Sequence, residues 1–132
     1  MPEGVKNEAS WISSCCRISA RARDLLEGRL GLFETSSAMN RLAMAIQVER
    51  YEDQDFRVFA LIHDDLCDLP VGPERAHWDK DALLREDKKI AAIEERSRTD
   101  ALAAARNLVE RYAWAYERRA ELRRVGHVFK DD

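Results

Sequence analysis

The last third of the chain carries the feature that most restricts the fold, a helical pattern too long for a domain of this size. From Asp79 to about Arg124, apolar residues recur at helical spacing without a strong breaker. A straight helix of that length would span roughly 65 Å at 1.5 Å per residue. A compact domain of this chain length has a radius of gyration of only about 14 Å. The helix must therefore break, or it projects and finds a partner.

Two sequence signals suggest how this long helix is divided. Ser97 and Asp100 stand three residues apart before an apolar run. This spacing resembles a capping box, and it indicates a kink near Arg98. Gly126 follows the end of the pattern and is expected to terminate the helix. Residues 125–132 are then expected to form a loose tail.

Three shorter helices are predicted before the long one. Apolar periodicity places them at residues 9–27, 32–50 and 55–66. Gly28 ends the first, and the short link after it predicts an antiparallel helical hairpin. Asp55 is the expected N-cap of the third. The run 58–62 could also form a buried strand, but a lone strand would leave its backbone groups unpaired. We therefore expect a helix there.

Composition agrees with an all-α fold. The 132 residues include only 5 Gly and 3 Pro, and 36% of them are charged. Such a chain, rich in Ala, Leu, Arg and Glu, favours helices. We expect one helical domain over residues 1–132, a bundle of four or five helices with a long C-terminal helix. The expected core comprises Trp11, Ile18, Leu25, Leu42, Ile46, Phe56, Phe59, Trp78, Leu84, Ile90 and Leu108.

Several classes of function are disfavoured by charge, hydropathy and cysteine usage. The formal net charge of −3 argues against a nucleic-acid partner. No apolar run approaches the roughly 18 residues of a membrane helix, so no membrane association is expected. The N-terminus has no hydrophobic signal region, which predicts a cytoplasmic protein. Cys15, Cys16 and Cys67 form no Cys-x-x-Cys pair and are expected to be reduced thiols.

The sequence contains no arrangement that predicts catalysis or a metal. The cysteines lie in apolar or acidic surroundings, which do not activate a thiol, so we expect no catalytic residue and no cofactor. His63 and Cys67 could face one way on a helix, with His77 nearby. A structural zinc site needs about four ligands, so no metal site is expected. An enzyme nevertheless stays possible.

Charged residues interrupt the apolar stripe of the long helix. Asp87, Glu94 and Arg98 all fall on this stripe. One interpretation is that the stripe is wide and these residues lie at its solvated edge. The other is a polar cluster that fixes helix register or lines a pocket. The second would suit a small helical enzyme or a ligand-sensing protein.

Acidic residues gather around the third predicted helix and the loop that follows it. The loop, residues 67–77, is the only long irregular stretch, and loops on a rigid scaffold often carry recognition. We expect a partner to bind an acidic surface there, formed by Asp64, Asp65, Asp68 and Glu74. The alternative is an ordinary solvated surface.

Small residues in the long helix suggest self-association. Ala101, Ala104 and Ala105 would allow another helix to approach closely. We therefore expect this stripe to pack against a second copy of the chain, as a homo-oligomer.

Scattered positions in the middle third also carry a resemblance. They read Phe56-x-x-Phe59-x-x-Ile62, Leu69-Pro70, Arg75-x-x-Trp78, Leu84-x-x-Asp87 and Glu94-x-x-x-Arg98. The pattern resembles a family of small bacterial helical proteins that are often encoded among toxin and immunity genes. The resemblance implies a helical interaction role and no catalytic residue. It also implies that Glu94 and Arg98 belong to one continuous helix. The function expected on these grounds is that of an immunity protein, which neutralises a basic toxin by direct binding.

Overall fold

The protein folds into an all-α structure, as predicted. The computed structural model describes residues 7–127, and this part of the chain contains helices and no strand. The helices are α1 (Glu8–Leu26), α2 (Leu32–Ala45), α3 (Phe56–Leu66), the 3-10 turn η1 (Pro73–His77), α4 (Lys80–Arg111) and α5 (Trp114–Arg124).

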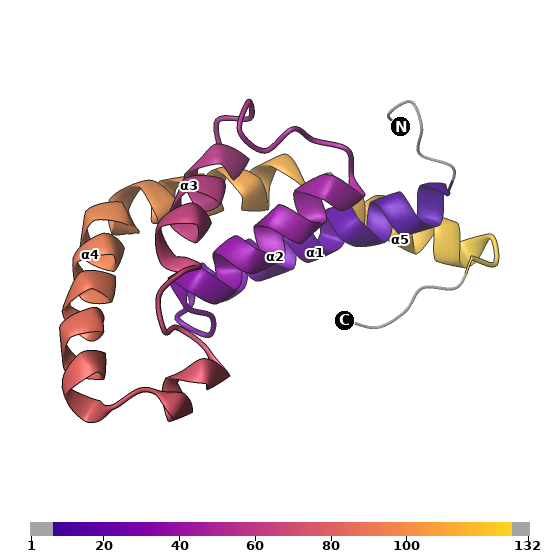
Figure 1. Ribbon diagram of the computed structural model, residues 1–132. Helices are drawn as coiled ribbons and strands as arrows, with labels where there is room; N and C mark the ends of the chain where they lie inside the picture. The colour runs from indigo at the N-terminus through magenta and orange to yellow at the C-terminus, as the bar shows by residue number, and fades with distance from the viewer. Residues whose placement is uncertain (1–6, 128–132) are drawn as a thin grey trace.

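The helix α1 lies at the centre of the bundle. It packs against α2, with which it forms the expected hairpin, and against α4 and α5 (Figure 1). The third helix packs against α2 and α4. Because α1 has neighbours on several sides, both of its cysteines and two of its serines are buried along with its apolar residues. The buried set on α1 is Ile12, Ser14, Cys15, Cys16, Ile18, Ser19, Ala22 and Leu25.

The second helix ends earlier than predicted. Its last residue is Ala45, so the predicted extension to residue 50 is wrong. Gln47 adopts a left-handed conformation with φ of 60°. This turns the chain so that the backbone N–H of Val48 donates to the carbonyl of Ala43 at 2.9 Å. The pattern of hydrogen bonds is that of a Schellman termination, which stops the helix even though apolar periodicity continues.

The start of α3 is stabilised by a different acidic residue from the one predicted. Asp55 stands at the N-cap position, but its side chain makes no capping hydrogen bond. The Oδ1 atom of Asp53 accepts instead from the backbone N–H groups of Asp55 and Phe56, at 3.0 and 3.1 Å. Asp53 therefore satisfies the otherwise unpaired donors at this helix end.

The long helix is bent, as predicted, but it does not break near Arg98. α4 runs from Lys80 to Arg111 without a break at Arg98, so the capping-box interpretation of Ser97 and Asp100 is wrong. Inside a helix the N–H groups already have carbonyl partners, and a capping side chain has no donor to satisfy. Figure 1 shows that α4 bends between its two halves. Glu94 and Arg98 thus share one helix.

The break comes later, at Tyr112 and Ala113. Beyond it, α5 continues along α1 toward the start of that helix, and Ala115 and Leu122 are buried (Figure 1). The helix ends at Arg124, and Gly126, which follows the C-cap Val125, has φ of 98°. Because the N–H of His127 donates to the carbonyl of Leu122 at 3.0 Å, residues 125–127 form an ordered turn. Residues 128–132 of the predicted tail lie outside the described part of the chain.

Most of the predicted core is confirmed. Seven of its members are buried, namely Ile18, Leu25, Leu42, Ile46, Phe56, Phe59 and Leu108. Trp11 and Ile90 are partly buried against this core, and the Trp11 ring packs on Trp114. Trp78 and Leu84 were predicted wrongly, because 40% and 63% of their surfaces are exposed.

The small residues of α4 serve the fold of the single chain. Ala101, Ala104 and Ala105 are buried within it, where α4 packs chiefly against α1 and α3. They allow these helices to approach closely, and their stripe is not available to a second copy.

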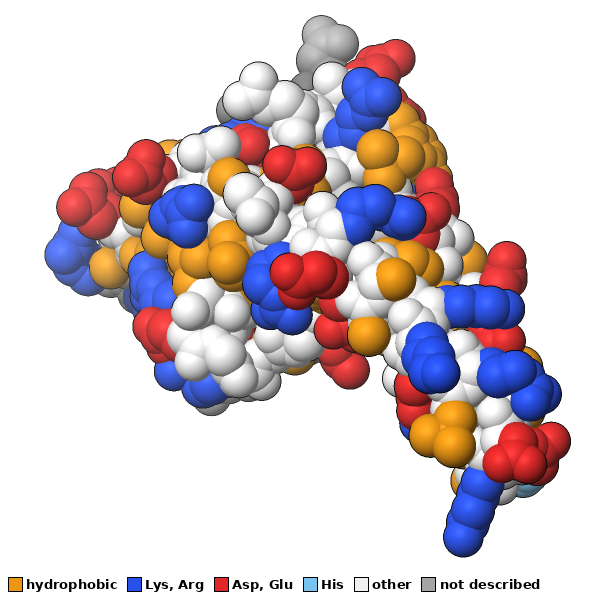
Figure 2. All heavy atoms as spheres, turned by 90° about the vertical axis from the view of Figure 1, so that its left-hand side faces the viewer, with side chains coloured by type: hydrophobic (Ala, Val, Ile, Leu, Met, Phe, Trp, Pro, Cys, Tyr) orange, Lys and Arg blue, Asp and Glu red, His pale blue; other side chains and the backbone are white. Residues whose placement is uncertain are grey.

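The first part of α4 stands apart from the bundle. We refer to residues 80–98 as the α4 arm. All the buried residues of α4 lie beyond it, between Ala101 and Leu108. In Figure 1 the arm and η1 lie to one side of the other helices, and in Figure 2 they form the lobe at the lower right. Trp78 and Leu84 are exposed because they belong to this outlying part.

Candidate functional site

The segment between α3 and α4 is attached to the bundle by its proline and the residues on either side. Pro70 is fully buried, and Leu69 and Val71 pack against the core. Glu74 folds back within η1, where its Oε1 atom accepts from the N–H of Gly72 at 3.1 Å. Trp78, which follows the segment and was expected in the core, is 40% exposed. The anchored part therefore lies at the beginning of the segment.

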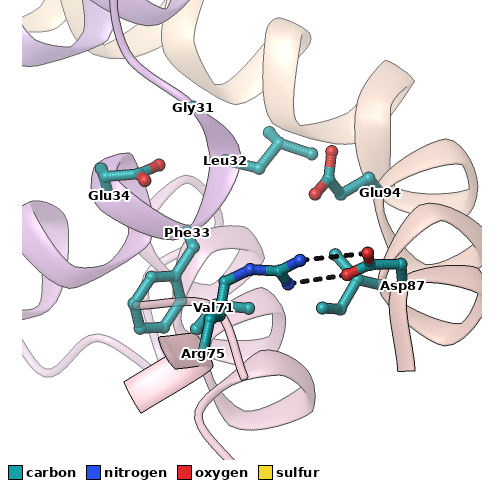
Figure 3. A pocket seen from close by; sticks show the side chains of 9 residues that line it. Gly31, Leu32, Phe33, Glu34, Val71, Arg75, Asp87 and Glu94 are labelled. Carbon is teal, nitrogen blue, oxygen red and sulfur yellow. Dashed lines mark hydrogen bonds and ion pairs between the residues drawn. The ribbon is translucent and has the colours of Figure 1, made fainter. Parts of the chain in front are cut away.

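Arg75 connects this segment to the α4 arm. Its Nη1 atom donates to the carbonyl of Pro70 at 2.8 Å. Its two terminal nitrogens also donate to both oxygens of Asp87, at 2.7 and 3.0 Å (Figure 3). The hydrogen bond from Arg75 lowers the pKa of the Asp87 carboxyl, and the same bond raises the pKa of Arg75. The paired charges hold the arm next to the loop.

A pocket of about 320 Å³ lies between the start of α2, the loop and the arm. Figure 3 shows that these three elements surround it. Its walls combine apolar and charged side chains. The lining residues are Gly31, Leu32, Phe33, Glu34, Val71, Arg75, Asp87, Ile90 and Glu94. The site can therefore hold a group that is partly apolar and partly charged.

The charges of the pocket are not balanced. Arg75 is its only cation and is already paired with Asp87. Within residues 7–127, neither Glu34 nor Glu94 has a hydrogen bond or an ion pair. In Figure 3 the Glu94 carboxylate is directed into the pocket, above the Arg75–Asp87 pair. An excess of negative charge results.

The structure brings together part of the predicted polar cluster. Asp87 and Glu94 line the same pocket, as the interpretation of a polar pocket requires. Arg98 is exposed on the arm and does not line it. The cation in its place is Arg75, which sequence reasoning missed. Helical periodicity relates residues on one helix, and Arg75 reaches Asp87 from a separate loop.

The predicted acidic surface is divided among several local interactions. The Tyr51 hydroxyl donates to the Asp64 carboxylate at 2.9 Å. Asp65 forms an ion pair with Arg96 at 3.1 Å. Asp68 and Glu74 are exposed. Acidic and basic side chains are also mixed on the face shown in Figure 2. Arg96 thus neutralises part of the predicted charge, and Tyr51 occupies the Asp64 carboxylate.

A second polar cluster connects the start of α3 with the end of α4. The guanidinium of Arg111 bonds to both carboxylate oxygens of Asp53, at 2.7 and 3.0 Å, and lies over the Phe56 and Tyr112 rings. Burial would raise the pKa of Asp53, but hydrogen bonds from Arg111 and from the backbone lower it overall. Burial raises the pKa of Tyr112 to about 12. These contacts join the start of α3 to the end of α4 and thus support the fold.

The residues considered as metal ligands have other contacts. The His63 ring stacks on Phe33, with centroids 5.5 Å apart. The Cys67 thiol contacts the carbonyl of Asp64 at 3.6 Å. Over residues 7–127, no group of three or more His, Cys, Asp or Glu side chains is arranged to hold a metal ion. All three cysteines are free thiols.

Neither hydropathy nor similarity assigns the chain to a known group. No helix within residues 7–127 is both long enough and apolar enough to cross a membrane. Comparison with protein-family models, with curated proteins and with solved structures gave no match to this chain.

Proposed function

We propose that this protein acts by binding another protein, without catalysis, and that the α4 arm and the adjoining pocket form its contact surface. The observation that carries the proposal is the exposure of the arm. The second half of the same helix packs against the bundle through four buried residues, yet Leu84 on the arm is 63% exposed. Apolar side chains on an outlying element commonly mark interaction sites.

A protein partner fits this surface better than a small molecule does. Leu84 lies one turn before Asp87, at the edge of the helix face that lines the pocket. Trp78 is also exposed, two residues before the start of the arm. A small ligand in the pocket would leave both side chains uncovered. A protein surface could cover the pocket and its apolar surroundings together.

The specific form that we propose is a cytoplasmic immunity protein, which neutralises a toxin by occluding it. The resemblance in the middle third of the chain supports this form, as does the excess of carboxylates in the pocket. Complementary charges increase the rate at which two proteins associate. A toxin with a basic surface is therefore the proposed partner.

A ligand-sensing function is the second candidate. Asp87 and Glu94 line one pocket, and this observation favours it. A sensor would bind its ligand inside the pocket and would not need Leu84. Substitution of Leu84 therefore separates the two functions.

The test uses the products of the genes that neighbour the one encoding this chain. Each product is purified, and its affinity for the protein is measured by calorimetry, with wild type, Leu84→Glu and Met44→Glu. Met44 is a matched control because it is 70% exposed at the end of α2. We expect one neighbouring product to be toxic when expressed alone, and both wild type and Met44→Glu to bind it. Leu84→Glu should weaken the binding at least about ten-fold, as loss of a central apolar contact does.

Two results would contradict the proposal. One is a folded Leu84→Glu variant that binds the toxic product as tightly as wild type does. The other is a dimer in sedimentation that Leu84→Glu dissociates, because the arm would then serve self-association.

A further inference from the structure

We propose that the pocket beside the α4 arm receives an arginine side chain of the partner protein. This inference rests on the proposed function and specifies what the surface recognises. It draws on the charge of the pocket, on its apolar walls and on a guanidinium that is already bound at its edge.

The charge of the pocket indicates that the side chain it receives is a cation. Glu34 and Glu94 are unpaired within the described residues, while Asp87 neutralises Arg75. An anion entering the pocket would meet the unpaired Glu94 carboxylate, and near it the Glu34 carboxylate, which folds back beside Gly31 at the start of α2. A cation would compensate them, and the partial shielding of the pocket from solvent would strengthen the attraction.

The apolar walls of the pocket indicate the shape of the side chain that it receives. Leu32, Phe33, Val71 and Ile90 supply apolar surface beside the carboxylates. A volume of about 320 Å³ corresponds to roughly ten water molecules at their volume in the liquid. A long side chain with an apolar stem and a charged end meets both conditions, and arginine and lysine have this form.

Arginine is favoured over lysine by the chemistry of the site. The edge of the pocket already binds one guanidinium, which Asp87 holds through two parallel hydrogen bonds. Glu94 offers a second carboxylate of the same geometry, and such pairs are frequently bidentate. The Phe33 ring forms part of the wall, and a planar guanidinium stacks on aromatic rings better than an ammonium group does.

The test measures binding of a small probe to the pocket in the absence of the partner protein. Isotope-labelled protein is titrated with N-acetyl-arginine amide, and the amide chemical shifts are followed by NMR. The control ligand is N-acetyl-citrulline amide, which has nearly the same shape without the charge. We expect the arginine probe to bind weakly and to shift residues 31–34, Ile90 and Glu94, while the citrulline probe leaves them unchanged.

Two variants test the role of Glu94. We expect Glu94→Gln to weaken binding of the arginine probe about three-fold or more, which is the size of effect that a partly exposed ion pair gives. Glu95→Gln serves as the matched control, because Glu95 is the exposed neighbour on another side of the same helix. It should leave binding unchanged. Circular dichroism establishes that both variants are folded.

The outcomes separate this inference from the proposed function. Equal shifts with citrulline and arginine, or no effect of Glu94→Gln, would overturn the arginine pocket even if the toxic product still binds. Binding of the arginine probe with no binding of any neighbouring product would retain the pocket and count against the immunity function. Shifts confined to residues outside the pocket would also overturn the inference.

Discussion

Three helix ends in this protein use the same left-handed turn, with different residues at the critical position. Gly28 and Gly126 have φ values of 77° and 98°. At the corresponding position after α2 the residue is Gln47, with φ of 60°. Glycine adopts this conformation readily, whereas a side chain with a Cβ atom is strained there. At the end of α2, a residue with a Cβ atom therefore occupies a backbone conformation that glycine would adopt without strain.

Replacing Gln47 with glycine is expected to stabilise the protein. The relief of strain should exceed the extra flexibility of the unfolded chain and raise the free energy of unfolding by about 0.5–1 kcal/mol. Urea denaturation measures this change. Gln47→Ala is the control, because alanine retains the Cβ atom and should bring no gain. A decrease in stability for Gln47→Gly would contradict the strain argument.

The three thiols are expected to differ sharply in reactivity. Cys15 and Cys16 are buried, and Cys67 is exposed. Burial, with a contribution from Cys16, raises the pKa of the Cys15 thiol to about 12. Because the thiolate is the reactive form, Cys15 should be inert at neutral pH. An aromatic disulfide reagent should modify only Cys67 in the native protein and all three cysteines after unfolding. Rapid native modification of a Cys67→Ser variant would show that the buried pair is accessible.

At the scale of the helices, the polar cluster formed by Arg111, Asp53, Phe56 and Tyr112 connects elements that are distant in sequence. Arg111 lies at the end of α4, and its partner Asp53 caps the start of α3. Removing the charge of Asp53 would weaken both the cap and the ion pair. The cluster therefore makes the contact between α3 and α4 dependent on pH.

The Asp53→Asn variant is expected to change the response of stability to acid. Hydrogen bonds in the fold lower the pKa of Asp53 below its ordinary value of 3.8. The carboxylate therefore stabilises the fold above that value, and this contribution is lost as the pH falls through the lowered pKa. Asp53→Asn should be less stable than wild type at pH 7, and the difference should shrink below about pH 4. Urea denaturation across this range measures it. A difference that stays constant with pH would show that the charge has no role.

Helices were predicted from the sequence more reliably than their ends and their long-range partners. Periodicity located α1, α3 and the start of α4 because apolar spacing is a local property. It gave no sign of the break at Tyr112 and Ala113, where the apolar pattern continues. It missed the end of α2, because the strained turn at Gln47 has no glycine to signal it. It placed Leu84 in the core, since periodicity identifies the apolar face of a helix but not whether another element covers it. The Arg75–Asp87 pair was missed because it joins a loop to a helix.

For the molecule as a whole, stability is expected to depend on the bundle and hardly at all on the α4 arm. Phe59 is fully buried, and Phe59→Ala should lower the free energy of unfolding by about 3–5 kcal/mol. Trp78 has an even larger aromatic side chain but is 40% exposed, and Trp78→Ala should cost less than about 1 kcal/mol. Thermal and urea unfolding give both values. Similar losses for the two variants would mean that the arm belongs to the core.

The central position of α1 has a consequence for synthesis of the chain. Its Ser19 hydroxyl donates to the carbonyl of Val109, and the Tyr116 hydroxyl donates to the carbonyl of Cys16. Closing a loop of 90 residues costs about 4 kcal/mol in chain entropy, and contacts so distant in sequence slow folding. While the chain emerges from the ribosome, α1 and α2 can pair early, but the other apolar face of α1 stays uncovered. We expect chaperones to hold the nascent chain until Leu108 and Ala115 have emerged.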